Sequence, residues 1–194
     1  MKTPHFGKFV LWTLLSLPLL FLGYAWQSGL LVYGELLHLS GEFSARLLVV
    51  TMAITPLRLM FPKSGWSAWL LMRRRNFGVA TFAYALLHTL VYVSRKQSLS
   101  LILDEGIEFS MWTGWAAFLV FLVLALTSND ASPRILRRTW KKIHRAVYVA
   151  AFLAFAHWIF IAFDFVPGLI HFVILLTLEI YRLWKRRKLV RHEN

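Results

Sequence analysis

Residues 77–93 read FGVATFAYALLHTLVYV, and residues 146–163 read AVYVAAFLAFAHWIFIAF. Each is an apolar run long enough to cross the ~30 Å hydrocarbon layer of a membrane as a helix. The first run contains His88 and the second contains His157. An ionisable side chain at membrane depth is unfavourable and is a functional hypothesis by default. These two runs therefore indicate both the fold class and the place of the chemistry.

Similar apolar runs recur along the whole chain. It has 194 residues, of which 58% are hydrophobic, with a mean hydropathy of +0.59, whereas soluble domains are typically about 45–50% apolar. The runs predict six spans, at residues 9–26, 43–61, 77–93, 111–127, 146–163 and 166–184. We therefore expect an all-α membrane protein, a six-helix bundle forming a single transmembrane domain over residues 1–194. We expect an outer loop at 27–42 that contains His38, and a short surface helix at 133–142.

The charge distribution predicts the orientation of the chain. The formal net charge is +13, yet only Arg46, Arg95 and Lys96 of the 22 basic residues fall in the predicted outer segments. Cytoplasmic loops carry such an excess of lysine and arginine, so we expect an inner-membrane protein with both termini in the cytoplasm. The basic clusters suit anionic lipid headgroups better than nucleic acid.

The chain contains no cysteine. Disulfides, thiolate-bound iron–sulfur clusters and covalent haem attachment are therefore excluded. Any haem in this protein must be non-covalent and held by histidine or another non-thiolate ligand.

The depth of each histidine follows from the helical rise. His88 lies about 20 Å beyond Arg75 along its span, and His157 lies about 20 Å beyond His144. His88 and His157 are thus predicted at one outer depth, as the two axial ligands of a b-type haem. His144 marks an inner depth, where the facing span offers Arg75 and no histidine. An inner haem would be ligated by histidine on one side only.

Two alternatives accompany this interpretation. Membrane histidines can simply hydrogen-bond a neighbouring helix, and His171 is expected to do so, with a quinone or flavin site as its alternative. Arg46 outside and Arg75 inside are candidates for pairing with cofactor anions, although contact with lipid headgroups is the simpler role. On one continuous ideal helix His144 and His157 would point about 220° apart, so a bend is needed if both face the same interior.

Four segments carry a family resemblance: residues 54–58 (ITPLR), 73–78 (RRRNFG), 124–128 (LALTS) and 140–148 (WKKIHRAVY). Together with His88 and His157 they resemble the ferric-reductase-like transmembrane family. Within it, the pattern is most similar to the MsrQ/YedZ family, the haem-binding membrane subunits of the periplasmic methionine-sulfoxide reductase system. The resemblance covers about residues 40–160. The second histidine that two-haem relatives carry on the His88 helix is absent.

The resemblance implies one or two b-type haems bound by the residues at His88, His144 and His157. It also implies flavin mononucleotide (FMN) and a periplasmic molybdopterin-containing partner that reduces methionine sulfoxide. We therefore expect an electron-transfer subunit that takes electrons from quinol or a cytoplasmic flavin reductase, with substrate chemistry on the partner. The alternatives are a stand-alone transmembrane ferric or oxygen-reducing reductase, and a non-redox small transporter or assembly protein.

Overall fold

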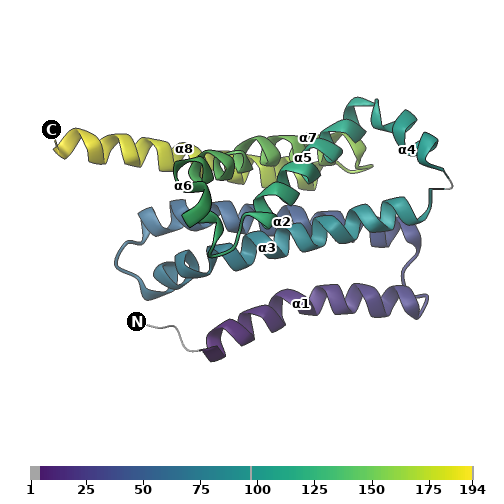
Figure 1. Ribbon diagram of the computed structural model, residues 1–194, viewed down its shortest axis with the longest axis horizontal. Helices are drawn as coiled ribbons and strands as arrows, with labels where there is room; N and C mark the ends of the chain where they lie inside the picture. The colour runs from purple at the N-terminus through teal and green to yellow at the C-terminus, as the bar shows by residue number, and fades with distance from the viewer. Residues whose placement is uncertain (1–4, 97, 194) are drawn as a thin grey trace.

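The computed structural model describes the backbone of residues 5–96 and 98–193, and the side chains of residues 7–96 and 98–189. Helices joined by short turns make up these ranges, and no strand occurs within them. In chain order the helices are α1 (His5–Gln27), α2 (Tyr33–Met60), α3 (Gly65–Ser94), α4 (Leu99–Gly106), α5 (Phe109–Leu126), α6 (Ser132–Arg145), α7 (Val147–Ile161) and α8 (Val166–Glu193) (Figure 1). The predicted all-α class is confirmed.

Within the described residues, six helical stretches are long and apolar enough to cross a membrane by length and composition. They are α1, α2, α3, α5, the stretch from α6 through α7, and α8, so the six predicted spans are confirmed. Helix α3 begins at Gly65, well before the predicted start at residue 77. The helix extends beyond the apolar run because no proline or glycine interrupts the chain between Trp66 and Asn76. The apolar run therefore predicts the part of the helix in the hydrocarbon layer and not its start.

The predicted outer loop at residues 27–42 is wrong from Tyr33 onward, because α2 begins there. Glu35 Oε2 accepts a hydrogen bond from the Val32 N–H at 3.0 Å and so caps the first turn. His38 is therefore a helical residue and not a loop residue. Helix α2 continues through Pro56 to Met60.

Two helix pairs form the core of the bundle. Helix α2 packs along α3, and α5 packs along α7, with α8 against both α2 and α7. Helix α1 lies along the side of the α2–α3 pair (Figure 1). Small side chains at the centre, Ala85, Ala117, Ala150 and Ala151, allow the close helix approach that is common in membrane bundles.

Charged residues distinguish the two ends of the bundle. The basic end comprises residues 58–75, 128–146 and 179–189, and the opposite end comprises residues 27–42, 88–96, 98–111 and 157–171. A helix is present where the short surface helix was predicted: it is α6, at the basic end, and it is interrupted at Arg137, where φ is +49°. Its location on the membrane surface stays a prediction. Helix α6 ends at Arg145 and α7 begins at Val147. The helix is therefore interrupted between His144 and His157. A bend was expected there if both side chains were to face the same interior.

Candidate functional site

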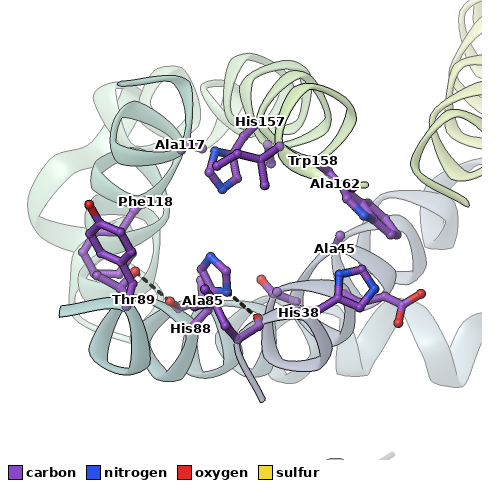
Figure 2. Close-up of a pocket in the computed structure, with 18 of the residues that line it drawn as sticks. His38, Ala45, Ala85, His88, Thr89, Ala117, Phe118, His157, Trp158 and Ala162 are labelled. Carbon is purple, nitrogen blue, oxygen red and sulfur yellow. Dashed lines mark hydrogen bonds between the residues drawn. The ribbon is translucent and has the colours of Figure 1, made fainter. Parts of the chain in front are cut away.

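A cavity of about 390 Å³ lies between α2, α3, α5 and α7. Figure 2 shows His88 and His157 pointing into it from opposite sides. Most of its other lining side chains are apolar or aromatic, including Leu37, Leu48, Trp115, Phe118, Phe121 and Trp158. Its volume is within the range of about 300–1,000 Å³ that is typical of cofactor and ligand sites.

The orientation of His88 is fixed by a backbone carbonyl of α2. Its Nδ1 lies 2.9 Å from the Leu37 carbonyl oxygen, and Ser40 Oγ lies 3.5 Å from the same nitrogen. A carbonyl can only accept, so Nδ1 carries the proton and donates it. Nε2, on the far side of the ring, is left with its lone pair.

His157 is held in the same way by a different helix. Its Nδ1 donates to the Ser110 carbonyl oxygen of α5 at 2.6 Å, so this ring also has an unprotonated Nε2. Histidines that ligate metals almost always donate their other N–H to such a partner, which fixes both tautomer and ring orientation. Both rings are thus set up as ligands through Nε2.

The separation of the two rings fits one shared metal ion. The ring centres lie 6.2 Å apart, and the ring planes are inclined at 82°. Two imidazoles bonded in line to one ion, each through a bond of about 2.0–2.1 Å, stand with ring centres roughly 6 Å apart. Haem iron accepts axial histidine, and the aromatic walls suit a porphyrin. The residues present therefore fit a haem with His88 and His157 on its two faces.

Two glycines make room for these rings. A Cβ atom at Gly41 would lie 2.9 Å from His88 Nδ1, and one at Gly114 would lie 2.6 Å from His157 Nδ1. Such separations are too short for a carbon atom beside a ring nitrogen, so glycine allows the backbone to approach each imidazole. Neither glycine was predicted from the sequence as part of the site, although an isolated glycine inside a helix often marks a close approach.

One face of α2 places two further polar side chains at the cavity and a third beside it. His38 and Glu42 both line it, which the sequence did not predict for either residue. Arg46, a predicted cofactor-binding residue, forms an ion pair with Glu42 through Nη2 and Oε1 at 2.5 Å. Its side chain is half exposed, at 49%. Glu42 thus holds Arg46 beside the cavity, one helical turn from a lining position.

His144 lies at the basic end, apart from the other two histidines. Its ring stacks on Trp140 with a centroid distance of 4.2 Å. Thr127 Oγ1 lies 3.1 Å from His144 Nε2 and 2.7 Å from the Val123 carbonyl oxygen. Nε2 of His144 is therefore engaged in a hydrogen bond, whereas Nε2 of each cavity histidine has no such partner in the described ranges. Iron ligation by His144 stays a prediction, and through Nε2 it would have to displace Thr127.

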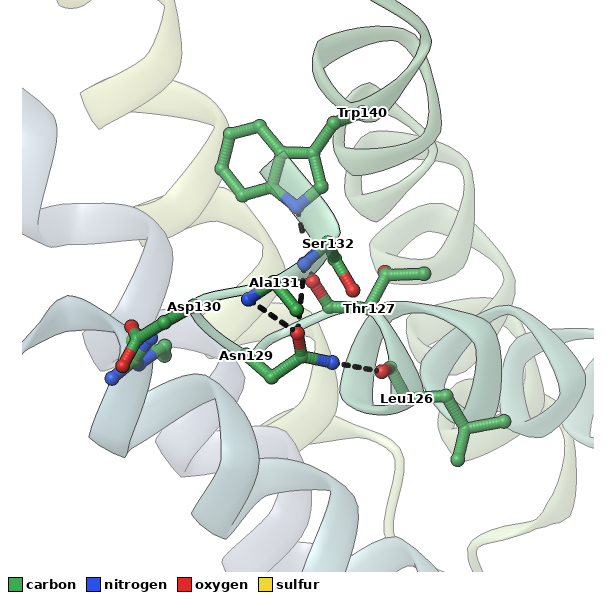
Figure 3. Close-up of polar contacts among 8 residues, drawn as sticks. Leu126, Thr127, Asn129, Asp130, Ala131, Ser132 and Trp140 are labelled. Carbon is green, nitrogen blue, oxygen red and sulfur yellow. Dashed lines mark hydrogen bonds and ion pairs between the residues drawn. The ribbon is translucent and has the colours of Figure 1, made fainter. Parts of the chain in front are cut away.

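Polar contacts in the turn after α5 fix this region (Figure 3). Trp140 Nε1 donates to the Thr127 carbonyl at 3.0 Å, and Asn129 Oδ1 accepts from the backbone N–H groups of Ala131 and Ser132. Arg75 donates to Asp130 Oδ1. This hydrogen bond and the charge of Arg75 hold the pKa of Asp130 below its ordinary value. Arg75 is thus engaged at the basic end, about 20 Å along α3 from His88.

Comparisons with known proteins agree with this arrangement. Residues 40–155 match the family model for the ferric reductase like transmembrane component. Three relatives are named protein-methionine-sulfoxide reductase heme-binding subunit MsrQ. The one from Xanthomonas axonopodis pv. citri is 32% identical over 87% of this chain and 82% of its own length. The one from Azospira oryzae is 37% identical over 62% of this chain and 52% of its own length. The one from Rhizobium meliloti is 38% identical over 60% of this chain and 53% of its own length.

No solved structure matches the chain. The family match covers more than half of the chain and includes His88, and it ends in α7 just before His157. The similarity to the Xanthomonas relative extends over most of both proteins. The chain therefore belongs to the MsrQ family of ferric-reductase-like transmembrane proteins.

Proposed function

We propose that this protein is the b-type cytochrome subunit of a methionine-sulfoxide reductase system. It takes electrons from quinol or a cytoplasmic flavin reductase and passes them across the inner membrane to a periplasmic molybdopterin-containing reductase. The observation that carries the proposal is the His88–His157 pair, with ring centres 6.2 Å apart across the cavity. The relatives' names, which specify a heme-binding subunit, support it independently.

In this proposal the chain positions the cofactor and the cofactor supplies one-electron chemistry. His88 and His157 bind the iron through Nε2, and the carbonyls of Leu37 and Ser110 keep both rings in place. The apolar cavity walls exclude water from the haem faces. Arg46, held by Glu42, is positioned to pair with a haem propionate.

The basic end is the proposed side of electron uptake. The positive-inside rule puts this end and both chain termini in the cytoplasm. Arg75 and its neighbouring cations offer charge-assisted contacts to the phosphate of FMN, which the family resemblance implies. His144 is proposed to assist electron transfer from this side. A second haem at His144 would be ligated by histidine on one side only.

Substrate chemistry is proposed to take place on the partner and not on this chain. The cavity contains the His88–His157 pair and mostly apolar walls, and its other polar lining side chains are chiefly His38, Glu42 and Ser44 of α2 and Thr89 and Tyr92 of α3. These side chains are assigned here to the surroundings of the haem. Methionine-sulfoxide reduction therefore requires the periplasmic subunit.

The proposal can be tested with the purified chain in liposomes. The haem is reduced with dithionite under anaerobic conditions, and its absorbance is followed after mixing with the periplasmic reductase and methionine sulfoxide. We expect rapid reoxidation only when both are present. Replacing dithionite with quinol or with a flavin reductase and its reductant identifies the electron donor.

Each other outcome favours a different function. Fast reoxidation by ferric iron or oxygen, with no response to the reductase, would favour a stand-alone reductase. Purified protein without any reducible Soret band would favour the non-redox alternative. Methionine-sulfoxide turnover by the chain alone, with artificial electron donors, would contradict the division of labour between the two subunits.

A further inference from the structure

A buried arginine of α3 has no counterion among the residues that the structure describes. Arg73 is only 6% exposed, and its Nε and Nη2 atoms are buried without a hydrogen-bond partner there. It lies on the face of α3 between Trp69 and Phe77, one turn to either side. These two residues belong to an apolar cluster with Leu11 of α1 and Ile54 of α2. An unpaired charge in such surroundings is strongly unfavourable.

A second buried arginine of the basic end, unlike Arg73, has partners from its own chain. Arg182 of α8 is 8% exposed, close to the value for Arg73. Its Nη2 pairs with Glu179 Oε2 at 2.8 Å, and its Nη1 donates to the Tyr148 hydroxyl. The guanidinium also lies 4.9 Å from the centre of the Tyr148 ring. Arg182 thus has partners from its own chain, whereas Arg73 has no such partner within the described ranges.

The sequence explains why Arg73 lacks such a partner. The chain has nine acidic residues, and none occurs in α1 or α3. The acidic residues of α2, Glu35 and Glu42, lie in its first half, toward the opposite end. At the basic end Asp130 pairs with Arg75 and Glu179 pairs with Arg182. The helices around Arg73 therefore provide no carboxylate for it.

The depth of Arg73 indicates the source of the missing anion. It lies about 32 Å along α3 from Ser94, close to the ~30 Å thickness of the hydrocarbon layer. Arg73 is thus at the level of the headgroups on the basic side. Its guanidinium reaches the first turns of α1, where a Cβ atom at Gly7 would lie 3.9 Å from Nη2. Lys8, the next residue, adds an exposed cation there.

We propose that the seam between α1 and α3 binds the phosphate of an anionic phospholipid through Arg73. Basic pockets between transmembrane helices are known to hold such headgroups. The phosphate would supply the charge that the chain lacks, and it would tie α1 to the α2–α3 pair. This site is separate from the haem cavity and does not depend on the proposed function.

Thermal unfolding with defined lipids tests this proposal. The full protein is delipidated in neutral detergent, and its Tm is measured by tryptophan fluorescence after adding phosphatidylglycerol or phosphatidylcholine. We expect phosphatidylglycerol to raise Tm by about 2–4 °C more than phosphatidylcholine, because only the anionic lipid would bind the folded state at Arg73. The Arg73→Met variant should lose this difference, whereas Arg187→Gln, which removes an exposed charge, should keep it.

A further variant and a soluble anion sharpen the test. Gly7→Leu keeps Arg73 but fills the space beside its guanidinium, so it should also reduce the phosphatidylglycerol effect. This variant provides the test if Arg73→Met fails to fold. An equal Tm increase from inorganic phosphate would overturn the lipid assignment in favour of a soluble anion. An undiminished phosphatidylglycerol effect in either Arg73→Met or Gly7→Leu would overturn the site itself. The Soret spectrum should be unchanged in both variants.

Discussion

Histidines at the two ends of the bundle differ in the nitrogen that they leave free. At the end opposite the basic one, His88 and His157 donate from Nδ1 to backbone carbonyls, and Nε2 of each ring is available. At the basic end, Nε2 of His144 is hydrogen-bonded to Thr127 Oγ1, and Nδ1 is the other ring nitrogen. Residue type and membrane depth are therefore insufficient to identify a haem ligand. The hydrogen-bond partner of each ring decides which nitrogen is left to bind iron.

Removing a cavity histidine should have the largest effect. We expect His88→Ala or His157→Ala to abolish the low-spin haem signal, because each ring supplies one of the two axial bonds. The measurement is the reduced-minus-oxidised spectrum of purified protein, with the haem-to-protein ratio. His171→Ala is the control, since that ring bonds its own helix through Nδ1 and the Pro167 carbonyl. Normal low-spin spectra in both cavity variants would sink the assignment.

The glycines beside the rings should show the next largest effect. An added methyl group at Gly114 or Gly41 must displace the imidazole, and overpacking of this kind typically costs about 1–3 kcal/mol. We expect reduced haem occupancy, more for Gly114→Ala than for Gly41→Ala, because the distance at Gly114 is shorter. Gly78→Ala is a matched control in α3, where a Cβ atom would make an ordinary 3.7 Å contact with Thr51. Full occupancy in Gly114→Ala would show that the His157 ring is not confined as described.

Variants at the basic end sharpen the comparison. We expect His144→Ala to leave the low-spin spectrum of the cavity haem intact while slowing haem reduction from the cytoplasmic side severalfold. Thr127→Val removes the hydrogen-bond partner of His144 Nε2 but retains the imidazole. If His144 acts through this hydrogen bond, the two variants should slow reduction alike, as measured by stopped-flow absorbance. Loss of all haem from folded His144→Ala would instead make His144 a ligand or support of the single haem.

The exposed Arg75–Asp130 pair should give the smallest effect. The folded-state pKa of Asp130 is lowered by Arg75, so its stabilising contribution is present above the unfolded pKa of about 3.9. It is lost as the pH falls through the lower, folded value. Asp130→Asn should therefore lower Tm slightly at pH 7, and the difference from the wild type should disappear in acid. A difference that persists at the lowest pH would mean that Asp130 acts through something other than its charge.

Depth along a helix could be predicted from the sequence because the rise per residue is constant. This is why His88 and His157 are predicted at one level, and their ring centres indeed lie 6.2 Å apart. The start of α2 could not be predicted from hydropathy, because residues 33–42 mix polar and apolar side chains. That error placed His38 in a loop and left the Leu37 carbonyl out of the site.

The hydrogen-bond partners of each histidine ring could not be predicted from the sequence either. They depend on how the helices are rotated against one another, and one sequence contains no direct record of that rotation. Gly114 and the Ser110 carbonyl lie on α5, which carries no charged residue that would indicate a functional role for this helix. The sequence likewise gave no sign that Thr127 would be hydrogen-bonded to His144. The roles of Arg46 and Arg75 in cofactor binding stay predictions, each now with a defined acidic partner.

Electron paramagnetic resonance of the oxidised, purified protein tests most directly whether His88 and His157 share one haem. Iron bound by both histidines must be low-spin, and imidazole planes inclined at 82° predict a highly anisotropic low-spin signal. Coplanar imidazoles would give an ordinary rhombic low-spin signal. We expect the highly anisotropic signal as the main species. A predominantly high-spin signal would contradict the shared ligation of one haem by these two histidines.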